Sequence, residues 1–252
     1  MRVLKFGGSS VANAQNIKLV LDIVVNKAKE EKLIVVVSAF SKITDLLQLA
    51  SQKAAAGDES FKEILADLET KHLDALKELI PVSEQSSLLS HIKRIINHLE
   101  TLLDGCYLLG ELSPRTSDTI LSFGELLSSY IIAEALKQKL KNSSYKDSRE
   151  LIKTNNSFGK AVVNFDVSNK LIVDFFASNE NQVVVMPGFI AASLDGINTT
   201  LGRGGSDYTA AILAGALHAN ELEIWTDVNG MFTANPKIVK QAQPIATISY
   251  QE

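Results

Sequence analysis

Cysteine is nearly absent from this 252-residue chain, in which Cys106 stands alone. An intrachain disulfide and a cysteine cage for a metal are therefore excluded. Histidine is also scarce: the chain has four, His72, His91, His98 and His218, and none has a second ligand at metal spacing. We expect these histidines to be solvated or structural, and Cys106, which falls on an apolar helical stripe, to be packed.

The chain also lacks an excess of positive charge and a signal-peptide core. Lys and Arg number 25 against 29 Asp and Glu, which gives a formal net charge of −4. This balance argues against a surface that grips nucleic acid or an anionic membrane, whereas a small anion needs only local positive charge. The N-terminus runs straight into a strand pattern, and we expect no apolar run long enough to span a bilayer. The sequence therefore predicts a cytoplasmic protein with no nucleic-acid or membrane partner.

Apolar residues make up 46% of the chain, enough for a large buried core. Several short apolar runs do not alternate with polar residues, which is typical of strands covered on both faces in a parallel sheet. Helical periodicity separates the runs, beginning with a helix from about Asn13. We therefore predict an α/β fold, a three-layer α/β/α sandwich with a mostly parallel central sheet. Its expected strands lie at residues 3–6, 33–37, 183–186 and 222–226.

A long helical stretch, about residues 45–140, interrupts this alternation. It is broken at Gly57, at Pro81 and at the pair Ser113-Pro114. We expect these helices to form a subdomain or lid beside the sheet, within one catalytic domain that spans residues 1–252.

Two glycine-containing turns follow strands: Lys5-Phe6-Gly7-Gly8-Ser9-Ser10 and Gly202-Arg203-Gly204-Gly205-Ser206-Asp207. Adjacent glycines let backbone N–H groups approach an anion, and a helix that follows adds unpaired N–H groups and a positive dipole end. Either pair alone is equally well interpreted as a tight turn, but two such turns with charged partners favour phosphate binding. The chain contains no P-loop string, and the first turn lacks the dinucleotide-binding fingerprint.

Charged residues near these turns have complementary uses. Lys5 can reach over its own turn to neutralise charge on a transferred phosphoryl group, and Arg203 offers a planar fork for a carboxylate. Asp207 falls in the first turn of a helix, where it either complements the dipole or holds a lysine in position. Glu125 follows Gly124 at the start of an apolar helix. It is either an ordinary surface residue or a partly buried carboxylate that can accept an ammonium group.

Together, and in the order in which they occur along the chain, the two glycine turns and the other motifs of the sequence resemble the catalytic domain of aspartokinases. Aspartokinases are members of the amino-acid kinase family. The resemblance covers essentially the whole chain, and its most specific strings are Gly-Arg-Gly-Gly-Ser-Asp-Tyr-Thr and Trp-Thr-Asp-Val. The opening residues, the Lys-Ile-Thr triplet and the last four residues are most similar to the kinase portion of bifunctional aspartokinase/homoserine dehydrogenases. The matching segments are residues 5–10, 36–39, 43–44, 122–125, 187–190, 201–208 and 225–230.

The resemblance implies ATP-dependent phosphorylation of the side-chain carboxylate of L-aspartate, which gives 4-phospho-L-aspartate for lysine, threonine and methionine biosynthesis. Such a carboxylate is already ionised at neutral pH, so the reaction needs no general base. The resemblance also implies that Mg²⁺ is carried on ATP and that the full-length protein is a homo-oligomer. It implies Lys5 and Asp207 as catalytic residues, and a substrate-binding set of Ser38, Thr44, Glu125, Arg203 and Ser206. The implied nucleotide-binding set is Lys5, Gly7, Gly8, Ser9, Thr226, Asp227, Gly230, Phe232 and Lys237.

The chain departs from the family pattern in places. Ser9 replaces a threonine, Phe232 replaces a tyrosine, and Asn235-Pro236-Lys237 replaces an Asp-Pro-Arg pattern. The family continues into a helix with Phe-Gly-Ala-Lys and into regulatory ACT domains, so we expect residues 1–252 alone to turn over weakly or not at all. Two alternatives stay open: another amino-acid kinase, acting on acetylglutamate, glutamate or carbamate, and a non-catalytic ligand-binding module.

Overall fold

The computed structural model describes residues 1–228, 230–236 and 238–249. Its centre is a five-stranded sheet in the order β3-β5-β2-β1-β8, in which all neighbouring strands are parallel. Phe6 is in register with Val37 on one side and Trp225 on the other, so the carboxyl ends of three strands meet at one edge. The strands are β1 (Arg2–Phe6), β2 (Leu33–Val37), β3 (Ser143–Tyr145), β5 (Val183–Pro187) and β8 (Glu221–Trp225).

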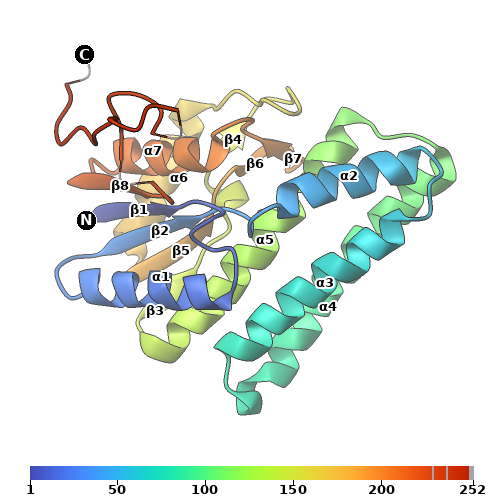
Figure 1. Ribbon diagram of the computed structural model, residues 1–252, viewed down its shortest axis with the longest axis horizontal. Helices are drawn as coiled ribbons and strands as arrows, with labels where there is room; N and C mark the ends of the chain where they lie inside the picture. The colour runs from blue at the N-terminus through green and yellow to red at the C-terminus, as the bar shows by residue number, and fades with distance from the viewer. Residues whose placement is uncertain (229, 237, 250–252) are drawn as a thin grey trace.

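Helices cover both faces of this sheet (Figure 1). On one face lie α1 (Ala14–Lys27) and α5 (Pro114–Lys139), and on the other α6 (Phe165–Ser178) and α7 (Gly205–Ala216). The strand β2 shows why its apolar run does not alternate: Val35 packs in the core on the α1 side, whereas Val36 packs in the core on the α7 side. The predicted three-layer α/β/α sandwich is confirmed.

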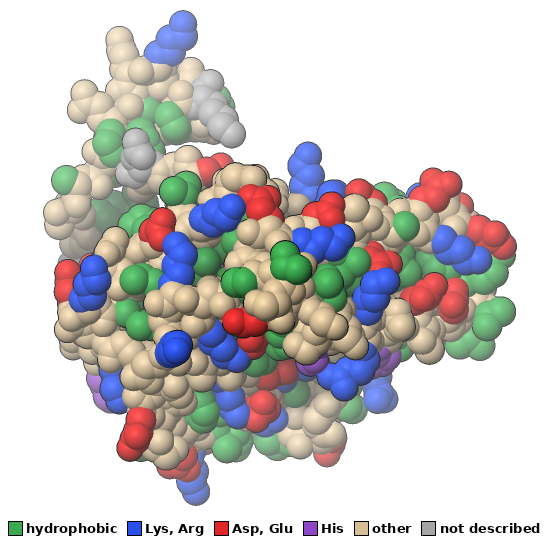
Figure 2. Space-filling view, turned by 90° about the horizontal axis from the view of Figure 1, so that it is seen from below, with side chains coloured by type: hydrophobic (Ala, Val, Ile, Leu, Met, Phe, Trp, Pro, Cys, Tyr) green, Lys and Arg blue, Asp and Glu red, His purple; other side chains and the backbone are tan. Residues whose placement is uncertain are grey.

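The long helical stretch contains α2 (Ile43–Ala55), α3 (Phe61–Leu79) and α4 (Val82–Leu109) in addition to α5. These helices end or begin beside the predicted breaks, and α4 is closed by Gly110 in the left-handed conformation. In Figure 1, α2, α3 and α4 extend beside the sheet, and α5 joins them to it. Acidic and basic side chains are interspersed over the face seen in Figure 2.

The helix α5 corrects the expectation that no apolar run is long enough to cross a membrane. It contains an 18-residue window with sufficient length and hydropathy, but 72% of that window is buried inside the protein. Because α5 packs against the sheet on one side and against α2 and α4 on the other, its apolar character is that of a core helix.

Two further features differ from the predictions. The strand β8 is not buried on both faces, because it lies at the edge of the sheet, where Ile224 is 50% exposed. A second sheet, in the order β4-β6-β7, was not predicted, because its strands are only two to four residues long. It comprises β4 (Lys153–Thr154), β6 (Ile190–Ser193) and β7 (Asn198–Thr200), and the 3-10 helix η1 (Ser148–Glu150) precedes it.

Candidate active site

A cavity of about 400 Å³ lies where the carboxyl ends of β1 and β2 meet the N-terminus of α7. Sites in parallel α/β sheets are expected at this edge. Every predicted catalytic and substrate-binding residue lines this one cavity, although the residues come from five separate segments of the chain. These residues are Lys5, Ser38, Thr44, Glu125, Arg203, Ser206 and Asp207, and Gly8 and Ser9 of the nucleotide-binding set join them.

An ion pair joins the two predicted catalytic residues. The Lys5 ammonium lies 2.7 Å from Oδ1 of Asp207, which is in the first turn of α7. Lys5 is only 8% exposed, so Asp207 holds a nearly buried charge at the end of β1. A Cβ on Gly7 would lie 3.5 Å from the same Nζ atom, and the glycine therefore keeps space open beside the ammonium.

The N-terminus of α7 faces the cavity. Gly204 precedes the helix with φ 73°, a conformation that favours glycine, and Gly205 N donates to the Gly202 carbonyl at 2.9 Å. No side-chain hydrogen bond from the described residues caps the helix. The first residues of the helix line the cavity, among them the buried Ser206. An uncapped helix N-terminus offers unpaired N–H groups and a positive dipole end, as the sequence predicts for this turn.

The first glycine turn differs from its prediction in one respect, because the N-terminus of the helix after it is capped. The helix α1 begins at Ala14, as the predicted start at about Asn13 requires, and Asn13 caps it by accepting a hydrogen bond from Asn16 N at 2.9 Å. Close approach of backbone gives the turn its shape instead: a Cβ on Gly8 would lie 3.1 Å from the Ala39 carbonyl oxygen. Any anion held here is bound by turn N–H groups rather than by a helix dipole.

Glu125 is buried rather than partly buried, with 3% of its surface exposed. Its Oε1 accepts a hydrogen bond from Ala39 N at 3.2 Å, whereas the buried Oε2 has no hydrogen-bond partner in the described part of the chain. Burial raises the pKa of this carboxyl to about 8, against the opposing effect of the Ala39 bond. A buried carboxylate oxygen without a partner favours a cationic ligand group in the cavity.

Five other residues of the nucleotide-binding set do not line this cavity: Gly7 lies in the first glycine turn, and Thr226, Asp227, Gly230 and Phe232 lie beyond β8. Gly7 N donates to the Trp225 carbonyl at 3.2 Å, which places the start of this segment beside the first glycine turn. Thr226 donates to Asp227 Oδ1 at 3.0 Å, and farther along Gly230 has φ 99°. Phe232 forms an isolated bridge with Pro244, and Lys237 lies outside the described residues.

Residues 1–252 match the family model described as the amino acid kinase family. The chain belongs to the amino acid kinase family. Its relatives include bifunctional aspartokinase/homoserine dehydrogenase 2 of Arabidopsis thaliana, 35% identical over 251 residues, and lysine-sensitive aspartokinase 3 of Escherichia coli, 34% identical over 252 residues. Both alignments cover 99% of this chain, but only 27% and 54% of those proteins.

Solved structures of aspartokinases are also similar to this chain. Escherichia coli aspartokinase III in complex with aspartate and ADP has a TM-score of 0.87 and 34% identity, over 97% of this chain and 53% of that one. The same enzyme in complex with lysine and aspartate has a TM-score of 0.84 and 33% identity, again over 97% and 53%. This amino acid kinase chain therefore spans about half the length of the shorter relatives and about a quarter of the bifunctional ones.

Two buried polar side chains of this amino acid kinase lie outside the predicted site residues. Asp118 on α5 is 1% exposed and accepts hydrogen bonds from Gly159 N at 2.9 Å and from Thr200 N at 2.8 Å. His72 on α3 is fully buried and stacks on Phe40, a residue of the cavity wall, with ring centroids 4.8 Å apart. Asp118 was not predicted, and its only signal was a lone carboxylate two helical turns before Glu125. His72 agrees with the expectation of a solvated or structural histidine, although nothing in the sequence marked it as the buried one.

Proposed function

We propose that this amino acid kinase transfers the terminal phosphoryl group of ATP to the side-chain carboxylate of L-aspartate, giving 4-phospho-L-aspartate. The proposal rests on one observation above all: Glu125, whose buried Oε2 has no hydrogen-bond partner among the described residues, lines the same cavity as Lys5 and Arg203. An amino acid supplies the ammonium and carboxylate groups that such an arrangement lacks. The aspartokinase relatives, and the aspartate and ADP in the similar structure, support the same substrates.

Each residue of the cavity has a role in this proposal. Arg203 binds the α-carboxylate of L-aspartate bidentately, and Glu125 accepts a hydrogen bond from its ammonium group. Lys5 stabilises the negative charge of the transferring phosphoryl group, and Asp207 keeps the Lys5 ammonium in place. The hydroxyl groups of Ser38, Thr44 and Ser206 contact the bound amino acid.

Two anions must meet for phosphoryl transfer to a carboxylate. The attacking carboxylate is ionised at neutral pH, so positioning and charge neutralisation replace a general base. We assign the ATP phosphates to the turn at Gly7, Gly8 and Ser9 and to the N-terminus of α7. The rest of the nucleotide is assigned to the segment after β8: Thr226, Asp227, Gly230, Phe232 and Lys237.

Magnesium fits this site as a companion of ATP. No group of three or more His, Cys, Asp or Glu within residues 1–228, 230–236 and 238–249 is arranged to hold a metal ion. Mg²⁺ prefers phosphate oxygens with one or two carboxylates, and Asp45, which also lines the cavity, is available as one. When bound, the ion neutralises charge on the phosphates.

The proposal extends to the protein that carries this chain. We infer that it also has a homoserine dehydrogenase activity, because the Arabidopsis thaliana relative is named for both activities. Its homo-oligomeric state and its cytoplasmic location stay predictions from the sequence.

The test measures ADP formation from ATP and Mg²⁺ by the full-length protein with L-aspartate, L-glutamate, N-acetyl-L-glutamate or carbamate as acceptor. We expect L-aspartate to be used best and Glu125→Gln to raise the L-aspartate KM. Preference for N-acetyl-L-glutamate or carbamate would identify a different amino acid kinase. Binding of L-aspartate without ADP formation from any acceptor would identify a non-catalytic module.

A further inference from the structure

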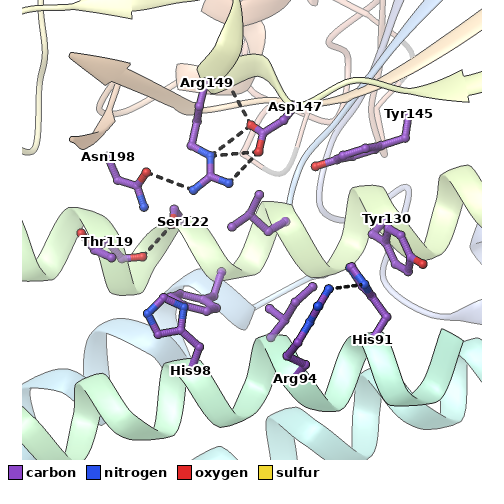
Figure 3. Close-up of a pocket in the computed structure, with 13 residues that line it drawn as sticks. His91, Arg94, His98, Thr119, Ser122, Tyr130, Tyr145, Asp147, Arg149 and Asn198 are labelled. Atoms are coloured by element: carbon purple, nitrogen blue, oxygen red, sulfur yellow. Dashed lines mark hydrogen bonds and ion pairs between the residues drawn. The ribbon is translucent and has the colours of Figure 1, made fainter. Parts of the chain in front are cut away.

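A second cavity, of about 590 Å³, lies outside the proposed active site. In Figure 3, His91 and Arg94 point into it from α4, and Tyr130 comes from α5. Arg149 and Asp147, which flank the start of η1, close the opposite side. The volume is within the range of protein sites for small molecules, and the cavity is larger than the 400 Å³ proposed for L-aspartate.

Positive charge in this second cavity is only partly neutralised. The Arg149 guanidinium is occupied, because its Nη2 lies 2.6 Å from Oδ2 of Asp147 and its Nη1 donates to Asn198 at 3.0 Å. Arg94 has no acidic partner within ion-pair distance among the described residues, and its contact is His91 Nδ1 at 3.0 Å. Burial and the Arg94 charge lower the pKa of His91, so its neutral ring is the acceptor.

Aromatic rings form much of the wall beside the Arg94 guanidinium. His91 stacks on Tyr130 with ring centroids 4.2 Å apart, and Tyr130 meets Tyr145 edge to face at 6.3 Å. Farther along, His98 meets Phe123 edge to face at 5.4 Å. Flat rings pack well against these walls, and an anionic group would complete the hydrogen bonding of Arg94.

We propose that this cavity is a second ligand site, which binds a small aromatic carboxylate with its carboxylate on Arg94 and its ring against Tyr130 and Tyr145. This proposal is independent of the proposed kinase activity. The site shares α5 with the active site, because Leu126 lines the second cavity and Glu125 lines the first.

The experiment uses the imidazole NMR signals of the full-length protein, in which this chain contributes four histidines. Indole-3-acetate is the probe, and the signals are assigned with His91→Gln and His98→Gln. We expect saturable shifts of His91 and His98, with a Kd below about 1 mM, and no shift of His72 or His218. Indole-3-acetamide, which lacks the charge, and acetate, which lacks the ring, should each bind at least about tenfold more weakly.

A matched pair of variants tests the role of Arg94. Arg94→Gln should weaken indole-3-acetate binding about tenfold or more, because it removes the guanidinium proposed to bind the carboxylate. Lys93→Gln removes the same charge from the neighbouring position, but Lys93 faces Glu69 of α3, at 3.6 Å, and the variant should bind as the wild type does. Equal loss in both variants, shifts of all the histidines, or no binding of indole-3-acetate would each overturn the proposal.

Discussion

Asp118 and Thr200 are 82 residues apart in the sequence and are joined by two hydrogen bonds. Thr200 donates to the buried Asp118 carboxylate from its N at 2.8 Å and from its Oγ1 at 3.0 Å. Asp118 precedes Glu125 by two turns of α5, and Thr200 precedes Arg203 by three residues. The pair therefore ties α5 to the segment that leads to Arg203, and we expect it to set the spacing between the proposed contacts for the ammonium and the α-carboxylate of L-aspartate.

The first prediction concerns this spacing. Asp118→Asn should raise the KM for L-aspartate about tenfold with a smaller change in kcat, because it misplaces binding groups rather than reacting ones. It should also lower the free energy of unfolding by about 1–3 kcal/mol, since a buried N–H group loses its acceptor. Thr200→Val removes one hydrogen bond and should change the KM and the free energy of unfolding less than Asp118→Asn does. The double variant should change each of them by less than the sum of the two single effects. A fall in kcat at constant KM would contradict this role.

The second prediction concerns pH. Because burial raises the pKa of Glu125 to about 8, its carboxyl is mostly protonated in the free protein at pH 7. Binding an ammonium group requires the ionised form, so the L-aspartate Kd should fall about tenfold per unit between pH 6 and pH 7 and level off above about pH 8. Calorimetry at pH 7 in buffers of different ionisation enthalpy should show release of about 0.9 proton. Glu125→Gln should abolish both effects, and proton uptake by the wild type would contradict the assignment.

Much of the fold could be predicted because its signals are local. The run at residues 33–37 and the breaks at Gly57 and Pro81 appear in the sequence as directly as in the structure. Exposure of β8 could not be predicted, because a strand's place in a sheet depends on which strands pair with it. The second sheet was missed because a two-residue strand such as Lys153–Thr154 has no periodicity to detect.

The site residues likewise divide into those with a local signal in the sequence and those without one. Lys5 and Arg203 stood beside glycine turns and were found by the chemistry of those turns. The burial of Glu125 depends on the approach of α5 to Ala39, which Gly124 permits and no local pattern shows. The role of Asp118 depends on partners 41 and 82 residues away in the chain. Distant contacts of this kind arise only from the packed fold.

The third prediction separates chemistry from binding. Lys5→Ala should lower kcat about a hundredfold or more, because it removes the proposed charge on the transferring phosphoryl group. L-aspartate affinity, measured by calorimetry, should change less than about threefold, a shift under 1 kcal/mol. Lys18→Ala is the control, because Lys18 is an exposed lysine that pairs with Glu78 at 2.8 Å on the surface. A large loss of affinity in Lys5→Ala would mean that the two subsites have been exchanged.

The fourth prediction concerns stability against acid. Burial lowers the pKa of His72 from its ordinary value of 6.5 to about 4, so the folded protein keeps this ring neutral. As the pH falls below about 6.5 the unfolded chain takes up a proton that the folded chain does not, so stability falls until about pH 4. The loss at pH 5 should be about 2 kcal/mol. Urea unfolding at pH 7 and pH 5 should show this loss of stability in the wild type and not in His72→Leu. An equal pH dependence of the free energy of unfolding in the two proteins would contradict the prediction.

The fifth prediction compares two glycines. A Cβ on Gly188 would lie 2.8 Å from Cα of Ser206, at the N-terminus of α7, so Gly188→Ala must displace backbone at the proposed site. We expect it to lower the free energy of unfolding by about 1–3 kcal/mol and to weaken the binding of both ATP and L-aspartate. Gly105, inside α4, has open space around it, and Gly105→Ala should raise the free energy of unfolding by up to about 1 kcal/mol with unchanged binding. Calorimetric titration and urea unfolding of both variants measure these effects, and normal ligand binding by Gly188→Ala would show that the α7 N-terminus holds neither ligand.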